Sequence, residues 1–231
     1  MSVEINTNRF YVVSTPIGNL EDVTLRALRI LKEVDVIFCE DTRVTRRLLD
    51  KYEIRTRMES LNAQTERGKV YKVITFLQEG KNVALVTDAG TPGISDPGSF
   101  VVSKVRETVP EVRIETIPGP SALTAALSIA GVPTNEFTFL GFLPHKKGRQ
   151  TLFKEIAGSE RTMVFYESPH RIMKALASLV EFLTPEHKVV IARELTKIFE
   201  EVVSGSAQET LEYFEKNTDK QRGEFVVIVS R

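Results

Sequence analysis

The segment TDAGTPGISDPG (residues 87–98) gives the strongest indication of fold in this 231-residue chain. It follows an apolar run at 82–87 that predicts a strand, and it leads into a segment of helical period at 97–108. Ligands of open α/β sheets bind at the carboxyl ends of such strands. The alternative is a structural turn in which Asp96 caps the next helix. We favour a ligand loop, because a plain turn rarely needs so many glycines and prolines.

Short β-branched runs alternate with helical segments on both sides of this loop, as is typical of an α/β chain with a largely parallel sheet. In the first half, the expected strands are 10–14, 34–39, 82–87 and 113–117. The expected helices are 22–32, 42–52, 65–78 and 97–108. Asp22, Thr42 and Asp96 are expected to cap three of these helices, because a short polar side chain accepts the free amide hydrogens of a first turn.

Pro118-Gly119-Pro120 interrupts this rhythm, since two prolines prevent a strand or helix from continuing. We therefore expect two α/β domains, 1–117 and 118–231. In the second, the expected strands are 137–141, 162–166, 188–193, 202–206 and 224–230. The expected helices are 121–130, 149–157, 169–183 and 208–216. The late strands have short connections, so this domain is expected to have a mixed sheet with antiparallel pairs.

The charge balance excludes some classes of protein. Lys and Arg total 31 and Asp and Glu total 31, which argues against a globally basic nucleic-acid-coating protein and against a polyacidic tail. Cys39 is the only cysteine, so an intrachain disulfide and a cysteine metal cage are excluded and a reducing compartment is expected. Residues 1–8 lack the apolar run of a signal peptide, and no apolar stretch approaches the roughly 20 residues of a membrane helix. We expect a cytoplasmic protein that does not enter a membrane.

Two further loops follow predicted strands of the first domain. STPIGNLED (residues 14–22) comes after the first strand, and PGPSAL (118–123) comes after the last. The first is equally consistent with a plain strand-to-helix turn, and the second with an interdomain elbow in which Ser121 caps a helix. Because parallel strands open onto one edge, we expect both loops to lie beside Asp88.

The second half offers two candidate sites at strand ends. In FYESPHR (165–171), Ser168 and Pro169 are an expected helix cap, and Glu167 and His170 are possible acid-base groups, although a structural role is the commoner one. ARELTK (192–197) ends another strand with three charges, which fit a site and a surface ion pair equally well. Dinucleotide, P-loop, metalloprotease and serine hydrolase signatures are absent from the sequence.

Six motifs together resemble a known family. In chain order they read STPIGNLEDVTLRAL, EDTRVTRRLL, DAGTPGISDPG, PGPSALTAAL, FYESPHRI and ARELTK. This series is similar to the ribosomal RNA small subunit methyltransferase I family of the tetrapyrrole methylase superfamily, from about Tyr11 to Ser230. Tetrapyrrole-modifying members have a glycine-rich first loop where this chain has STPIGN, and that difference favours the RNA-modifying branch.

The resemblance implies a two-domain α/β fold that binds S-adenosylmethionine in the interdomain cleft, usually as a homodimer. It implies methylation of the ribose 2'-hydroxyl of a cytidine in the decoding region of 16S rRNA. We expect no metal site. The implied cofactor contacts are Pro16, Ile17, Gly18, Asp88, Gly90, Thr91, Pro92, Gly93, Ile94, Ser121, Ala122, Tyr166, Ala192, Leu195 and Phe225. Glu167 is a candidate general base and Lys197 a candidate for stabilising the emerging alkoxide, and the resemblance does not settle either role.

RNA binding needs local positive charge even in a neutral chain. Arg43, Arg46, Arg47 and Lys51 share one face of the helix 42–52, with Val44, Leu48 and Tyr52 expected on the buried face. A second basic segment contains Lys146, Lys147 and Arg149. A solvated helix face is the alternative, and we favour contacts with rRNA phosphates. Two other functions stay open: methylation of a tetrapyrrole or other small molecule, and a non-catalytic role in ribosome assembly.

Overall fold

The computed structural model describes residues 8–231 and divides the chain into two compact units. The first ends at Ser121 and the second spans Ala122–Arg231. This division falls within a few residues of the boundary at 118 expected from the sequence. The expectation for residues 1–8 concerns residues outside the described part of the chain, apart from Asn8.

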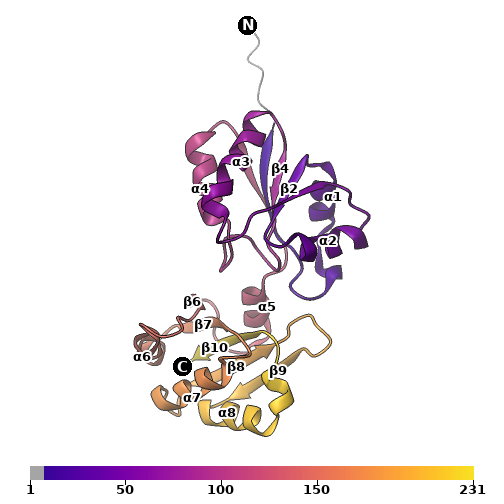
Figure 1. The fold of residues 1–231 in the computed structure, drawn as a ribbon. Coiled ribbons are helices and arrows are strands. Elements are labelled where there is room, and N and C mark those ends of the chain that lie inside the picture. Colours follow the sequence, from indigo (N-terminus) through magenta and orange to yellow (C-terminus); the bar gives the residue numbers. More distant parts are fainter. Residues whose placement is uncertain (1–7) are drawn as a thin grey trace. The chain divides into compact units, whose positions relative to one another are not determined.

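The first unit is a parallel sheet with helices on both faces (Figure 1). Its elements are β1 Arg9–Val13, η1 Leu20–Asp22, α1 Leu25–Glu33, β2 Val36–Cys39, α2 Thr42–Lys51, β3 Arg57–Ser60, α3 Glu66–Gln78, β4 Val83–Leu85, α4 Ser99–Thr108 and β5 Arg113–Ile117. The strand order is β3-β2-β4-β1-β5, and every pair is parallel. The carboxyl ends of β1, β2, β4 and β5 therefore lie at one edge, which we name the carboxyl edge of the first sheet.

Alternation of side chains along β2 produces a core on each face of this sheet. Val36 and Phe38 belong to the core beneath α3 and α4, whereas Ile37 and Cys39 belong to the core beneath α1 and α2. All four side chains are completely buried. A strand that is covered on both faces has a continuous apolar sequence, and for this reason β2 is readily predicted.

Several local details differ from the sequence expectations. β3 has no counterpart among the expected strands, because its sequence Arg-Met-Glu-Ser is polar and it lies at the sheet edge. Thr24 rather than Asp22 caps α1, with its hydroxyl accepting the Ala27 amide hydrogen at 3.1 Å. Asp41 rather than Thr42 caps α2 in the same way.

The remaining differences in the first unit concern α4 and α2. Gly98, not Asp96, is the N-cap residue of α4. The expected buried face of α2 is displaced, because Thr45, Leu48 and Leu49 are buried. Val44 is 37% exposed, so it does not belong to the buried face.

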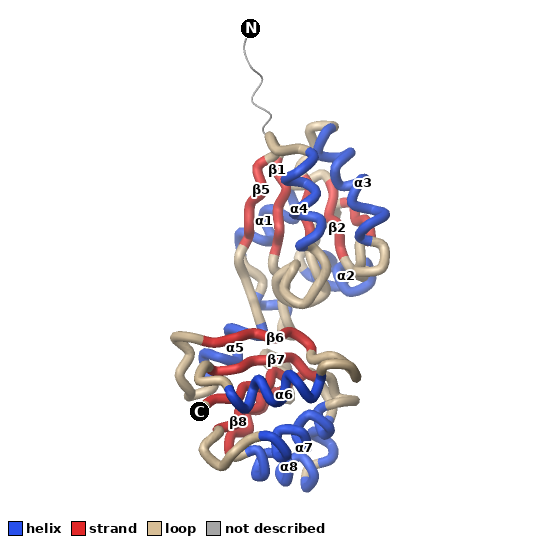
Figure 2. Tube along the Cα trace, turned by 90° about the vertical axis from the view of Figure 1, so that its left-hand side faces the viewer, coloured by secondary structure: helices blue, strands red, loops and turns tan. Residues whose placement is uncertain are grey.

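The second unit has a mixed sheet, with α7 and α8 packed together beside it (Figure 2). Its elements are α5 Ala122–Ile129, β6 Phe137–Phe142, α6 Arg149–Gly158, β7 Thr162–Glu167, α7 Ile172–Phe182, β8 Lys188–Arg193, β9 Glu201–Gly205, α8 Ala207–Lys216, η2 Thr218–Gln221 and β10 Phe225–Ser230. The strand order is β6-β7-β10-β8-β9, in which only β6 and β7 pair in parallel. The predicted α/β class, with a parallel first sheet and a mixed second sheet, is confirmed.

One aromatic-rich core holds the second unit together. Phe153 of α6 contacts Phe165 of β7 edge to face, and Phe214 of α8 contacts Phe225 of β10 in the same manner. The expected cap at Ser168 and Pro169 is wrong, because α7 begins at Ile172. Among the described residues, no helix is long and apolar enough to span a membrane.

Candidate active site

Three loops meet at the carboxyl edge of the first sheet, as their positions after parallel strands predict. The Thr15 amide donates to the Gly90 carbonyl at 2.9 Å, and the Gly90 amide donates back to the Thr15 carbonyl at 3.1 Å. The hydroxyls of Ser14 and Thr91 are hydrogen-bonded at 2.9 Å. The loop after β1 is therefore joined to the loop after β4 by backbone and side-chain bonds.

The third loop, after β5, packs against the same residues through Gly119. A Cβ atom built on Gly119 would lie only 3.0 Å from Cβ of Ser14. Gly98 is under a comparable constraint in the loop after β4. Its φ is +138°, and an added Cβ would lie 3.1 Å from the Gly93 amide nitrogen. Gly119 therefore allows the loops after β1 and β5 to approach closely, and Gly98 allows the tight turn within the loop after β4.

An acidic pocket of about 450 Å³ opens at this edge. We define the acidic pocket by its lining residues: Glu40, Asp41, Thr42, Ser60, Asn62, Ala63, Gln64 and Asp88. The Asp88 carboxylate accepts the Asp41 amide hydrogen at 3.0 Å, and the Glu40 carboxylate accepts the Thr87 hydroxyl hydrogen at 3.2 Å. Carboxylates from the ends of β2 and β4 thus line one concave surface.

These carboxylates differ in their acidity. Burial raises the pKa of Glu40, and the neighbouring Asp88 charge raises it further. Burial also raises the pKa of Asp88. By contrast, the exposed Arg43 side chain lowers the pKa of Asp41 to about 2 through a charged hydrogen bond. Glu40 and Asp88 are therefore the carboxyl groups of the acidic pocket that take up protons most readily.

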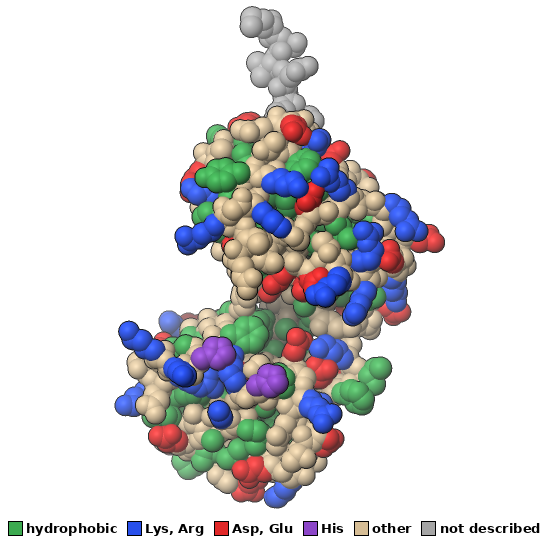
Figure 3. All heavy atoms as spheres, viewed as in Figure 1, with side chains coloured by type: hydrophobic (Ala, Val, Ile, Leu, Met, Phe, Trp, Pro, Cys, Tyr) green, Lys and Arg blue, Asp and Glu red, His purple; other side chains and the backbone are tan. Residues whose placement is uncertain are grey.

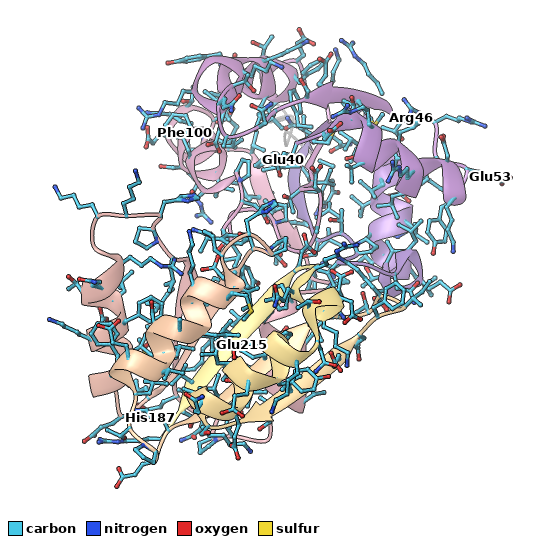
Figure 4. The ribbon with its side chains drawn as sticks, turned by 60° about the horizontal axis from the view of Figure 1, so that its bottom comes forward. Glu40, Arg46, Glu53, Phe100, His187 and Glu215 are labelled. Carbon is cyan, nitrogen blue, oxygen red and sulfur yellow. The ribbon has the colours of Figure 1, made fainter. Side chains whose placement is uncertain are left out.

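Sequence reasoning assigns no role to Glu40 or Asp41, although both belong to the EDTR motif. The available signal is their position, because they follow β2 as Asp88 follows β4. Two strands that neighbour one another in a parallel sheet end at the same edge. Figure 4 shows Glu40 in the first unit beside its sheet and Arg46 on α2.

The residues expected to bind the cofactor are divided between the two units. The first unit contains Pro16, Ile17, Gly18, Asp88, Gly90, Thr91, Pro92, Gly93, Ile94 and Ser121. The second contains Ala122, Tyr166, Ala192, Leu195 and Phe225. Those of the first unit belong to the three loops that meet at the carboxyl edge.

The expected contacts of the second unit differ greatly in accessibility. The Tyr166 ring is partly buried and lies edge to face with Phe139 and Phe142 at centroid distances of 4.9 and 5.4 Å. Ala192 and Phe225 are buried, and the Phe225 ring belongs to the core. The Phe225 ring is therefore part of the packed core, whereas Tyr166 keeps some exposed surface, and a cofactor contact at Tyr166 stays a prediction.

Glu167, the candidate base, lies at the end of β7 with its side chain completely buried. Its carboxylate forms ion pairs with Arg149 at 3.0 Å and with Arg171 at 2.8 Å, and it accepts the Ser168 amide hydrogen at 2.8 Å. Both of its carboxylate oxygens are therefore already engaged by guanidinium groups. The geometry favours an anchoring role, and the general-base role stays a prediction.

Lys197, the other candidate, is held by two carboxylates. Its Nζ lies 2.8 Å from Glu194 and 2.9 Å from Glu224, and these partners raise its pKa against the opposing effect of burial. Glu194 and Thr196 have φ values of +51° and +65°, so this turn is held in an unfavourable backbone conformation. The alkoxide-stabilising role also stays a prediction, since two carboxylates already neutralise the Lys197 charge.

The basic residues expected to bind RNA differ in exposure. Arg46 and Arg47 are exposed on α2, and neither forms an ion pair with the described residues. Arg43 pairs with Asp41, and Lys51 lies 3.7 Å from Glu21. Figure 3 shows Lys and Arg side chains spread over this part of the first unit.

The second basic segment has a different arrangement. Lys146 and Lys147 are exposed before α6. Arg149 is only 14% exposed at its side chain, and it pairs with Glu167 rather than pointing into solvent. The described residues include no group of three or more His, Cys, Asp or Glu side chains suited to a metal ion.

Comparison with known proteins identifies the family. The family model described as Tetrapyrrole (Corrin/Porphyrin) Methylases matches residues 9–211. The chain belongs to the tetrapyrrole methylase family. Within this family, a curated relative from Thermotoga maritima named ribosomal RNA small subunit methyltransferase I is 43% identical over 223 residues, covering 96% of this chain and 98% of the relative. The resemblance seen in the motifs is confirmed.

Solved structures of other methyltransferases share the fold. The structure of the methyltransferase CobJ matches with a TM-score of 0.71 at 20% identity, covering 97% of this chain and 95% of that chain. Uroporphyrin-III C-methyl transferase from Thermus thermophilus, complexed with S-adenyl homocysteine, matches with a TM-score of 0.65 at 18% identity, covering 97% and 98%. These similarities establish the fold.

Proposed function

We propose that this chain is an S-adenosylmethionine-dependent methyltransferase that methylates the ribose 2'-hydroxyl of a decoding-region cytidine in 16S rRNA. The observation that carries the proposal is the 43% identity, over 96% of the chain, to a relative named ribosomal RNA small subunit methyltransferase I. The first loop, STPIGNLED, also lacks the glycine-rich pattern of tetrapyrrole-modifying members.

The carboxyl edge of the first sheet suits this cofactor chemically. When bound, S-adenosylmethionine supplies an electrophilic methyl group on a positively charged sulfur, and it also has an ammonium group. Glu40, Asp41 and Asp88 provide negative charge to complement these groups. A Cβ atom at Gly90 would lie 3.6 Å from Ile17 and 3.9 Å from the Pro120 carbonyl, so the glycine leaves space that a side chain would fill. The residues present therefore fit the cofactor.

Catalysis of methyl transfer depends mainly on alignment of the acceptor hydroxyl with the methyl group. A proton acceptor must also take up the hydroxyl proton. Glu40 and Asp88 suit that task better than Glu167, because burial raises their pKa values while two arginines occupy Glu167. We accordingly add Glu40 and Asp88 to the candidates for the base.

Binding of the ribosomal substrate is assigned to the exposed cations. Arg46 and Arg47 on α2, with Lys146 and Lys147 before α6, are proposed to contact rRNA phosphates. We further propose that the active form is a homodimer and that the reaction takes place in the cytoplasm. Analytical ultracentrifugation tests the first of these statements, and a sedimenting monomer would contradict it.

The decisive comparison is transfer of labelled methyl from S-adenosylmethionine to two acceptors. We expect label to enter small ribosomal subunits purified from a strain that lacks the modification, and none to enter a porphyrinoid. Label in the porphyrinoid alone would show that the chain methylates a small molecule. If the chain bound rRNA but neither bound the cofactor in calorimetry nor transferred methyl, it would be a ribosome-assembly factor.

A further inference from the structure

Glu167 is the centre of a buried ionic cluster that we name the Glu167 clasp, made of Glu167, Arg149 and Arg171. The Glu167 side chain is completely buried, and those of Arg149 and Arg171 are 14% and 15% exposed. One carboxylate oxygen pairs with Arg149 and the other with Arg171. The clasp therefore joins the end of β7 to the first residue of α6 and to the residue before α7.

Both arginines also bind the backbone between β6 and α6. Arg171 donates from its Nη1 to the Leu143 carbonyl at 2.8 Å. Arg149 donates from its Nη1 to the Pro144 carbonyl at 3.3 Å, and its guanidinium lies 5.3 Å from the centre of the Phe153 ring. The segment that leads out of β6 is consequently held at two successive carbonyls by groups that Glu167 orients.

The segment held in this way leads directly into the basic loop, which we define as residues 145–148. Lys146 and Lys147 are exposed in it, and their chain continues into α6. Gly148, the N-cap of α6, has a φ of +85° and no side-chain capping bond. The basic loop thus carries two lysines and leads into the positive end of the α6 dipole. This combination favours the binding of a phosphate group.

Stability alone is a poor explanation for the clasp. Taking three charges out of water carries a large desolvation cost, and packed apolar side chains of similar size often stabilise a protein equally well or better. The two guanidinium groups provide directional bonds instead, which fix the geometry of the backbone they contact.

We infer that Glu167 is a positioning residue: through Arg149 and Arg171 it holds the basic loop so that Lys146 and Lys147 meet phosphates of the rRNA substrate. This inference rests on the proposed function. It assigns Glu167 to substrate binding, whereas a general base would act on the chemical step.

A double-mutant cycle tests this assignment. Affinity for small ribosomal subunits and the single-turnover rate at saturating subunits are measured for wild type, Glu167→Gln, Lys146→Ala/Lys147→Ala and the combined variant. Two lost phosphate contacts weaken binding roughly tenfold at about 0.15 M salt. We expect the lysine variant to lose about this factor and Glu167→Gln to lose several-fold, with the saturating rate unchanged. In the combined variant, Glu167→Gln should add almost nothing, because the lysines it positions are gone.

Glu201→Gln is the matched control. Glu201 lies on β9 and pairs with Lys220. β9 and β6 are the two opposite edge strands of the second sheet, so substitution of Glu201 should leave the affinity for small subunits unchanged. If Glu167→Gln does not fold, as judged by circular dichroism, Arg149→Lys replaces it in the cycle, because lysine keeps the charge but loses the forked geometry. The same loss of affinity is then expected.

Two results would overturn the inference. One is a lower saturating rate with unchanged subunit affinity in Glu167→Gln, as a general base requires. The other is a multiplicative loss of affinity in the combined variant, which would show that Glu167 acts independently of the lysines. A wild-type chain that fails to bind or methylate small subunits would instead overturn the proposed function, so the two failures are distinguishable.

Discussion

Gly119→Ala should destabilise the first unit, because the new methyl group collides with Ser14. The added Cβ would lie 3.0 Å from Cβ of Ser14 and 3.5 Å from its carbonyl oxygen. Ser14 is 2% exposed, its amide donates to Ile117 at 3.1 Å, and its hydroxyl is bonded to Thr91 at 2.9 Å. It is therefore held from two sides, and any shift that relieves the collision weakens one of these bonds.

The size of the effect follows from three contributions. Overpacking by one methyl group costs about 1–3 kcal/mol, and a weakened hydrogen bond costs up to about 1 kcal/mol more. Alanine also reduces the conformational freedom of the unfolded chain, which stabilises the fold by about 0.4–1 kcal/mol. We expect a net loss of about 1–3 kcal/mol, which lowers the melting temperature by roughly 4 °C per kcal/mol for a unit of about 120 residues.

Urea denaturation of wild type and variant measures this loss, and calorimetry with S-adenosylmethionine should show weaker binding. Gly68→Ala is the matched control, because Gly68 lies within α3 and an added Cβ would have no heavy atom within 4 Å. That variant should gain about 0.5–1 kcal/mol. If Gly119→Ala were as stable as wild type and bound the cofactor equally well, the close packing of the three loops would be refuted.

Three further predictions concern charge and capping. Burial raises the pKa of Glu40, so its charge destabilises the fold at neutral pH and this cost disappears below the ordinary carboxyl pKa. Glu40→Gln should therefore melt higher than wild type at about pH 7.5 and at the same temperature near pH 3.5. Reversal of Arg46 and Arg47 to Glu should weaken binding to small subunits and reduce the salt slope by about 1–2, with unchanged cofactor affinity in calorimetry. Ser206→Ala removes a capping box with Glu209 at the start of α8 and should cost about 1 kcal/mol in urea denaturation.

Each of these three predictions has a result that would contradict it. For Glu40→Gln, this result is a difference in melting temperature from wild type that is the same at both pH values. For the α2 arginines, it is unchanged affinity for small subunits, or a parallel loss of cofactor affinity that indicates misfolding. For Ser206, it is an unfolding free energy equal to that of wild type.

Sequence patterns reveal the architecture well where burial dictates the residues. The strands β2 and β4 are apolar throughout because helices cover both faces of their sheet. The sequence pattern does not predict the edge strand β3, because this strand is incompletely buried and most of its residues are polar. The caps of α1 and α2 are displaced by one or two residues because several neighbouring side chains, such as Asp41 and Thr42, are able to cap, and the backbone geometry selects one.

Only part of the candidate site can be predicted from the sequence. Loops that follow parallel strands must share an edge, so the meeting of Thr15 with Gly90 is predictable. The role of Glu167 is different, because its partners Arg149 and Arg171 come from separate elements and only the fold brings them together. A polar residue at a strand end is compatible with catalysis and with anchoring, and the burial and partners that bear on this choice are not visible in the sequence.

The location of the transferred methyl group is the most direct test of the proposed function. Small subunits that lack the modification are incubated with the chain and S-adenosylmethionine, and the 16S rRNA is digested and analysed by mass spectrometry. The proposed function predicts one added methyl group, on the ribose of a single decoding-region cytidine. A methyl group on a base, on another nucleotide, or on no rRNA at all would contradict it.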